Sequence, residues 1–247
     1  MHPVLFQVAG LTIYSYGVCT VLSYLAFGGV LMVTAKRLIE PFDEALRVAA
    51  GMLGGALIGG RLGFVLFNLD APWTLGSLLS FSGGFVFFTA LIGGMLGPMV
   101  VAWRRGRTIG TALDLVTPPM LAAWAVGNLG CFLAGCCWGP VTDVPWAVRF
   151  FAEVTPPELR GVPVHPTQLY ALLSDAAVLA LVFVWPGRPG TMFLRAVLSL
   201  AAIKLVLIVV GVGHGGAMLL IFPVLAAISA ILLFVLRTRP PAATPSS

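Results

Sequence analysis

The sequence predicts an all-α integral membrane protein with seven transmembrane helices. Of the 247 residues, 59% are apolar and only 9% are charged, and the mean hydropathy is +1.03. A chain of this composition can bury most of its surface only in lipid or in a very large core. Seven apolar windows are each long enough to cross a hydrocarbon layer of about 30 Å as a helix. They cover residues 11–34, 45–67, 84–103, 113–138, 166–186, 192–212 and 217–236.

The basic residues predict how these helices are oriented, because Lys and Arg gather in the cytoplasmic loops of membrane proteins. Only Arg149 and Arg160 lie in the loops that follow the even-numbered windows. The loops and tail after the odd-numbered windows hold Lys36, Arg37, Arg47, Arg104, Arg105, Arg107, Arg188, Arg237 and Arg239. We therefore expect the N-terminus outside and the C-terminus in the cytoplasm. The pI of about 9.4 then reflects topology and does not indicate nucleic-acid binding.

The chain is predicted to form one polytopic membrane domain over residues 1–236. Its first window is expected to be a retained helix, since no basic residue precedes it and no cleavage-site pattern follows it. Residues 139–165, between the fourth and fifth helices, hold five prolines and are too long for a simple turn. They favour an outward arm or lid, with a flexible connection as the alternative. Residues 237–247 are rich in Pro and Ser, which predicts a disordered cytoplasmic tail.

Charged residues inside the apolar windows are candidates for function. An ionised group at the bilayer centre costs about 2.5 to 3.5 kcal/mol on insertion scales, so it needs a partner or a role. Arg61 and Lys204 are expected in the outer half of the bilayer, where they would form a basic pocket for the phosphate of an anionic lipid. As the alternative, Asp175 pairs with one of these cations to hold helices together. Arg195 is expected to reach the cytoplasmic surface.

Two glycine-rich stretches predict close helix packing. GMLGGALIGG at 51–60 and LIGGMLG at 91–97 place small residues three and four apart on apolar helices, which lets two backbones approach closely.

The stretch CFLAGCCWG at 131–139 holds three of the four cysteines. On a regular helix Cys131, Cys136 and Cys137 point in different directions, so they converge only if Gly135 ends the helix. Their spacing is not that of a closed zinc site, and we expect neither a metal nor a cofactor. A disulfide from Cys131 to one of the other two, a reactive thiol, and small buried side chains all remain open.

Five segments, read in order, resemble the bacterial prolipoprotein diacylglyceryl transferase family. They are HPVLFQVAGLTIYSYGV at 2–18, GGRLGFVLFN at 59–68, SGGFVFFTALIGG at 82–94, GNLGCFLAGCCWGPVTDVPWAV at 127–148 and VHPTQLY at 164–170. The resemblance implies a multi-pass enzyme of the bacterial plasma membrane. Such an enzyme would move a diacylglyceryl group from phosphatidylglycerol, or another anionic phospholipid, to a cysteine thiol of a secreted prolipoprotein and release glycerol phosphate.

The resemblance also points to individual residues. Arg61, His165, Gln168 and Tyr170 fall on matching positions of the family motifs. In the central signature, Asn128 stands where the family has Arg, while Cys131 and Ala134 replace two Asn and Cys136 replaces Glu. Phe88 stands where the family has His, and Lys204 aligns with the Arg of the sixth helix. The chain is thus identified as a divergent member with a GCC version of the signature.

The predicted site combines these observations. We expect His165, Tyr170, Cys131 and Cys136 to act in catalysis, and Arg61, Lys204 and Asn128 to bind phosphate. Cys137, Gln168 and Asp175 would complete the polar site. Two other functions stay open: a membrane protein that handles soft metals or sulfur through its cysteines, and a non-catalytic lipid-binding member of the family.

Overall fold

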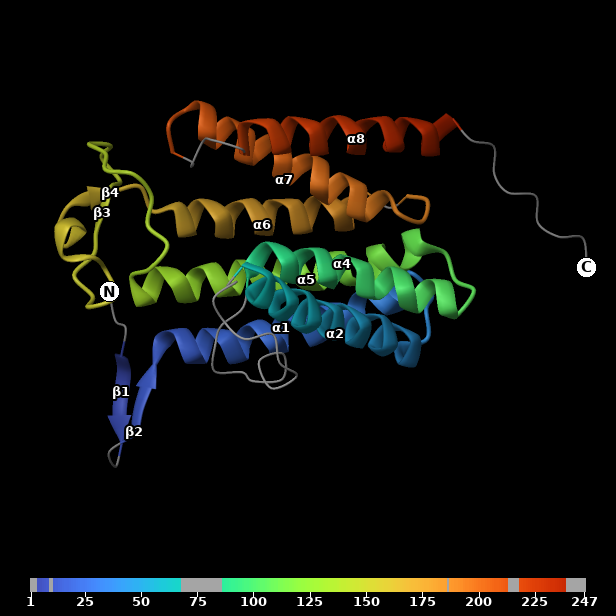
Figure 1. Cartoon of the computed structure of the whole chain (residues 1–247), viewed down its shortest axis with the longest axis horizontal. Helices are drawn as coiled ribbons and strands as arrows, with labels where there is room; N and C mark the ends of the chain where they lie inside the picture. The colour runs from blue at the N-terminus through green and yellow to red at the C-terminus, as the bar shows by residue number, and fades with distance from the viewer. Residues whose placement is uncertain (1–3, 9–10, 68–85, 186, 213–217, 239–247) are drawn as a thin grey trace, which may run out of the picture. The chain divides into compact units, whose positions relative to one another are not determined.

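The computed structural model describes residues 4–8, 11–67, 86–185, 187–212 and 218–238. Within these residues the chain forms seven long helices (Figure 1): α1 (Ser15–Arg37), α2 (Phe42–Phe67), α4 (Phe87–Arg104), α5 (Ile109–Ala134), α6 (Thr167–Val184), α7 (Thr191–Val209) and α8 (Met218–Thr238). Short elements complete it: the strands β1 (Val4–Val8), β2 (Leu11–Tyr14), β3 (Val148–Arg149) and β4 (Pro163–Val164), and the 3₁₀ turn η2 (Pro157–Leu159).

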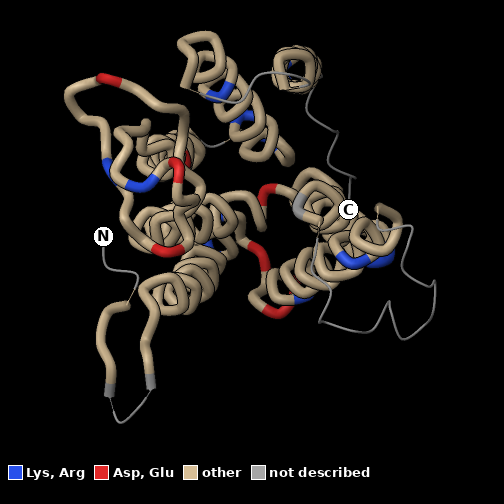
Figure 2. Tube along the Cα trace, turned by 60° about the vertical axis from the view of Figure 1, so that its left-hand side comes forward, with Lys and Arg blue, Asp and Glu red and all other residues tan. Residues whose placement is uncertain are grey.

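The seven predicted helices are all present. Six of them are long and apolar enough to cross a membrane, and the apolar stretch of α4 is somewhat shorter. Charged positions are sparse along the helices (Figure 2), as a lipid environment requires. The protein is thus a helical multi-pass membrane protein, while the orientation of its termini stays a prediction. Of the tail predicted at 237–247, Arg237 and Thr238 belong to α8, which corrects the prediction there, and residues 239–247 lie outside the described residues.

A pair of short strands precedes the first of the predicted helices. Helix α1 begins at Ser15 rather than at residue 11, because β1 and β2 pair as an antiparallel hairpin with Gln7 opposite Thr12. The two strands are rich in Val, Ile, Phe and Tyr, residue types that favour strands. A hydropathy window cannot separate such a strand from the first turns of an apolar helix.

The end of α5 corrects the predicted fourth helix, which was expected to continue to residue 138. The helix stops at Ala134, and Gly135 adopts a left-handed φ of +83°. Its N–H and that of Cys136 both bond to the Cys131 carbonyl, at 3.0 and 3.1 Å. A glycine in this conformation is a common helix terminator. The chain therefore leaves the helix between the first cysteine and the other two.

Residues 31–117 form one compact unit, here named the glycine-seam unit. Helices α2 and α4 pack along the two glycine-rich stretches, as predicted. A Cβ on Gly55 would lie 2.1 Å from the Gly93 carbonyl oxygen, and a Cβ on Gly97 would lie 1.9 Å from the Gly51 carbonyl oxygen. The two backbones therefore touch directly, and only glycine fits at these positions.

The described parts of residues 1–30 and 118–247 form a second compact unit, here named the cysteine unit. In it α7 packs against both α6 and α8 (Figure 1), and Gly130 of α5 lies against Cys19 of α1. The segment between α5 and α6 holds β3, η2 and β4, with Val148 paired to Val164. Phe150 of this segment is 1% exposed and packs edge-on against Phe132 of α5. The predicted arm is therefore a folded segment packed on the end of α5.

The glycine seam predicts a position-specific effect of adding one methyl group. Gly55→Ala is expected to destabilise the protein by about 1–3 kcal/mol, the usual cost of forcing extra atoms into a packed interior. Gly54→Ala is the matched control, because no described atom lies within 4 Å of a Cβ built there. Thermal unfolding of the purified proteins in detergent should give a lower Tm for Gly55→Ala alone. Equal Tm values for the two variants would contradict the backbone contact.

Candidate functional site

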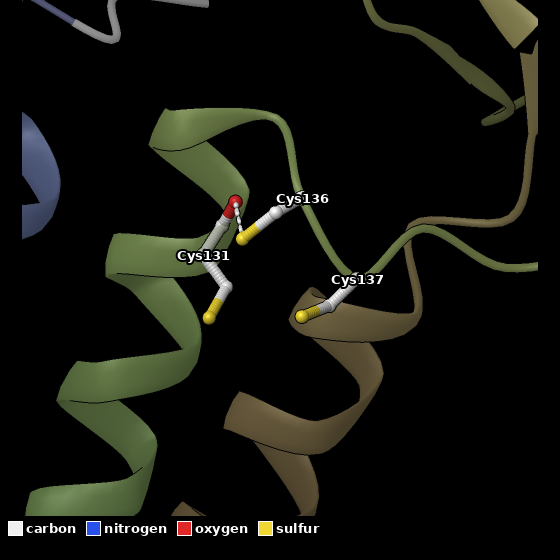
Figure 3. Close-up of side chains that lie close together, drawn as sticks. All are labelled: Cys131, Cys136 and Cys137. Atoms are coloured by element: carbon white, nitrogen blue, oxygen red, sulfur yellow. Dashed lines mark hydrogen bonds between the residues drawn. The ribbon is translucent and has the colours of Figure 1, made fainter. Parts of the chain in front are cut away.

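The cysteines Cys131, Cys136 and Cys137 form one cluster at the C-terminal end of α5. Their three sulfur atoms all lie within 4.8 Å of one another. Figure 3 shows the three side chains directed toward a common space, with Cys131 on the helix and the other two on the chain that leaves it. All three are free thiols. The sequence predicted that the three cysteines converge only if Gly135 ends the helix, and it does.

The backbone of Cys137 is held in an uncommon conformation. Its φ is +59°, and among the described residues only Ile39 is a second non-glycine residue with positive φ. This conformation costs about 1–2 kcal/mol for an L-residue. Such strain persists only where the surrounding structure imposes it, and here two hydrogen bonds to carbonyls in this segment do so. Thr167 Oγ1 donates to the Cys137 carbonyl at 2.8 Å, and Gln168 Nε2 donates to the Cys136 carbonyl.

The thiols outside the helix differ in acidity. Hydrogen bonds from Cys131 and Cys136 lower the pKa of Cys137 to about 6, against the opposing effect of burial. Burial, followed by the negative charge of a neighbouring Cys137 thiolate, raises the pKa of Cys136. Cys137 is exposed, whereas Cys131 and Cys136 are half-buried. The cluster therefore favours a thiolate at Cys137 that the other two thiols stabilise.

The cysteine segment is joined to the start of α6 by backbone pairing. The Gly139 N–H donates to the His165 carbonyl and the His165 N–H donates to the Pro140 carbonyl, each at 3.0 Å. A Cβ on Gly139 would lie 2.6 Å from Thr167 Cγ2, so a glycine is needed for this approach. The CCWG stretch and the HPTQLY stretch, which are distant in sequence, thus lie side by side.

His165 and Tyr170 form a hydrogen-bonded pair in this region. His165 Nδ1 lies 3.1 Å from Tyr170 Oη, and Trp146 Nε1 donates to the same oxygen at 2.7 Å. An indole N–H can only donate, so Tyr170 Oη accepts from Trp146 and keeps one further lone pair and its own proton. Trp146 was missed by the sequence reasoning, although it lies in the quoted segment at 127–148. Nothing in one sequence indicates that this indole reaches the tyrosine.

Gln168 is the most deeply buried polar residue of the site, at 2% exposure. Because a carbonyl oxygen can only accept, the Gln168 atom that faces Cys136 must be the Nε2 donor. Its Oε1 atom is buried and has no hydrogen-bond partner in the part of the chain that the structure describes. A buried acceptor without a partner is costly, so this oxygen is available to a bound water or ligand.

Asp175 lies on α6 at 6% exposure. Asn128 Nδ2 donates to its carboxylate at 3.0 Å, and Lys204 of α7 exerts an electrostatic attraction on it. No ion pair within 4.0 Å joins Asp175 to either candidate cation among the described residues. The Asp175 carboxylate is therefore held by a hydrogen bond to α5 and attracted by the charge of α7.

Arg61 lies on α2, in the glycine-seam unit, and is 8% exposed. Its guanidinium group lies over the Phe64 ring, 5.0 Å from the ring centroid. In this position the positive charge of the guanidinium is attracted to the electron-rich face of the ring. That Arg61 shares a pocket with Lys204 and the cysteines stays a prediction.

Comparisons with known proteins place the chain among relatives. The family model described as prolipoprotein diacylglyceryl transferase matches residues 3–235. A phosphatidylglycerol–prolipoprotein diacylglyceryl transferase of Clostridium tetani is 34% identical over 87% of this chain and 83% of its own length. Enzyme 2 of that name from Clostridium perfringens is 32% identical over 76% of this chain and 73% of its own length. The Geobacter sulfurreducens enzyme is 32% identical over 76% and 72%. This chain therefore belongs to the prolipoprotein diacylglyceryl transferase family.

Proposed function

We propose that this protein transfers a diacylglyceryl group from phosphatidylglycerol to the cysteine thiol of a prolipoprotein, in the plasma membrane of a bacterium. The relatives that carry this name are similar over most of the chain. The observation that supports catalysis most directly is the pair formed by His165 and Tyr170, 3.1 Å apart. Both lie on family motif positions, and backbone pairing holds His165 against the cysteine segment.

The reaction moves one proton and exchanges one bond. The acceptor thiol loses its proton, and its sulfur attacks the carbon of the diacylglyceryl group that is bonded to a phosphate oxygen. The carbon–oxygen bond then breaks, and glycerol phosphate leaves with the bonding electron pair. Such a step needs a base for the thiol and positive charge or hydrogen-bond donors for the departing phosphate.

His165 is the proposed base. For this role its proton is on Nδ1 and is donated to Tyr170 Oη, which leaves the Nε2 lone pair free to accept the thiol proton. Tyr170 then accepts from both His165 and Trp146 and has its own hydroxyl proton to donate to a substrate oxygen. Trp146 and Tyr170 would thus position the imidazole, in the way that a third group orients the base in other enzymes.

Arg61 and Lys204 are the proposed ligands of the lipid phosphate. The Arg61 guanidinium presents a planar fork of donors that matches phosphate oxygens, and the Lys204 ammonium supplies a point charge. Asn128 donates one N–H to Asp175 and has a second N–H for a phosphate oxygen. We place this site in the outer half of the bilayer, with the N-terminus outside, because the loop charges favour that orientation.

Transfer itself can be measured directly. Purified protein is incubated with phosphatidylglycerol vesicles and a peptide that carries a lipobox cysteine. The peptide mass is expected to rise by one diacylglyceryl group, with release of one glycerol phosphate, and a peptide with Ser in place of the cysteine should stay unmodified. No change in mass, under conditions where the Clostridium tetani relative modifies the peptide, would overturn the proposal in favour of a non-catalytic lipid-binding protein.

The hydrogen-bonded pair predicts graded losses of activity. His165→Gln removes the base and should lower kcat by about 10²- to 10⁴-fold. Tyr170→Phe removes a hydrogen bond to a charged group, worth about 1.5–3 kcal/mol, and should lower kcat by about 10- to 100-fold. Tyr24→Phe is the matched control, because Tyr24 is 67% exposed on α1. Full activity of His165→Gln with a normal Tm would exclude this residue as the base.

Lys204 distinguishes phosphate binding from a structural role. If its ammonium binds the lipid phosphate, Lys204→Gln should raise the KM for phosphatidylglycerol by about tenfold or more, as expected for loss of a charge-assisted hydrogen bond, with little change in Tm. If it mainly balances Asp175, then Lys204→Gln and Asp175→Asn should both lower the Tm and leave that KM unchanged. Kinetics over a range of lipid fractions, with thermal unfolding of each variant, separate the two results.

A further inference from the structure

The transfer mechanism proposed above assigns no step to the cysteine cluster, although the sequence led us to expect Cys131 and Cys136 to act in catalysis. Its three sulfur atoms lie within 4.8 Å of one another. A zinc–sulfur bond is about 2.3 Å long, so three sulfurs on one such ion are about 3.8 Å apart in a tetrahedral site and about 4.0 Å apart in a trigonal one. The thiols therefore need to move by only about 1 Å or less to share an ion.

We propose that Cys131, Cys136 and Cys137 bind one thiophilic d¹⁰ metal ion, Zn²⁺ or Cu⁺, through three thiolate ligands. Soft thiolate donors select these ions over hard cations. The three ligands come from a helix end and the turn that follows it, as Figure 3 shows. Three protein ligands leave one coordination position open, as in metal sites that keep an exchangeable ligand.

The surroundings of the cluster suit an ion better than three neutral thiols. Cys131 and Cys136 are half-buried, while Cys137 is exposed and gives an ion access from solvent. The amide of Gln168 lies against the same segment, and its buried Oε1 has no hydrogen-bond partner among the described residues. The backbone strain at Cys137 is also explained, because its left-handed φ is part of the turn that presents the third sulfur.

Charge favours Zn²⁺ of the two ions. Three thiolates with Zn²⁺ leave one net negative charge, whereas three thiolates with Cu⁺ leave two. Burying net charge is costly, and the hydrogen bonds to Cys137 come from Cys131 and Cys136, which carry no positive charge. A disulfide between two of the cysteines is the competing use of the same atoms, and it would leave only one thiol.

The test measures metal directly and does not depend on transferase activity. Full-length protein in detergent is reduced under anaerobic conditions and dialysed against Zn²⁺ or Cu⁺ in separate arms, and bound metal is counted by elemental and native mass spectrometry. We expect one bound ion per chain, and we expect Zn²⁺ to bind at a lower free metal concentration than Cu⁺. Tighter retention of Cu⁺ would support the site and reverse the assignment of the ion.

Variants locate the site. Losing a group that only supports a metal ligand typically weakens metal binding by about 10- to 100-fold. We expect a larger loss of metal affinity for each of the three ligand variants, Cys131→Ser, Cys136→Ser and Cys137→Ser. Cys19→Ser is the matched control, because Cys19 is the one cysteine outside the cluster. Unchanged binding in the three cluster variants, or no ion retained by the reduced wild-type protein, would overturn the proposal.

A second readout needs no variant, which matters if a serine at Cys131 disturbs α5. Bound metal should protect the exposed Cys137 from N-ethylmaleimide, and a chelator should restore its reaction. Peptide mapping of untreated protein reports any disulfide within the cluster. An unprotected Cys137 in the presence of saturating metal, or a disulfide that persists after reduction and metal loading, would likewise contradict the proposal.

Discussion

The contact between the end of α5 and the start of α6 is the constraint on which the site depends. Two backbone hydrogen bonds, between Gly139 and His165 and between His165 and Pro140, set the register of the two segments. Side-chain donors from Thr167 and Gln168 then bond to the carbonyls of Cys137 and Cys136. A shift of one residue in this pairing would break all four bonds and would move His165 relative to the thiols. The proposed base His165 and the cysteine cluster are therefore positioned by the same few bonds.

The segment between β3 and β4 supports that contact from the other side. Thr155 is 1% exposed, and its hydroxyl donates to the Gly135 carbonyl at 2.9 Å, one of the carbonyls left unpaired where α5 ends. Arg160 bonds to the backbone carbonyls of Thr155 and Glu153 and so closes the loop that carries the threonine. Since an unpaired buried carbonyl is costly, this loop stabilises the helix end that separates Cys131 from its two neighbours.

The sequence predicted the scaffold better than the contacts of the site. Hydropathy located every helix to within a few residues, because a membrane requires long apolar runs, and the glycine stretches revealed the α2–α4 seam. The strand β2 escaped notice because its residues, Leu11–Tyr14, lie inside the first apolar window. The contact of Trp146 with Tyr170 could not be foreseen, since it depends on how residues 135–166 fold back on themselves. The convergence of the cysteines was predictable only as a condition on Gly135.

The cysteine segment is held in place largely through its backbone atoms. Gln168 donates to the carbonyl of Cys136 rather than to its side chain, and Thr167 does the same at Cys137. Gly135 supplies the turn through its left-handed φ, and Gly139 allows the close approach to Thr167 and His165. The side chains at 131, 136 and 137 are therefore not the groups that accept these two hydrogen bonds. The cysteine segment differs in this respect from the pair of His165 and Tyr170, whose contact is made by side-chain atoms, the imidazole Nδ1 and the phenol Oη.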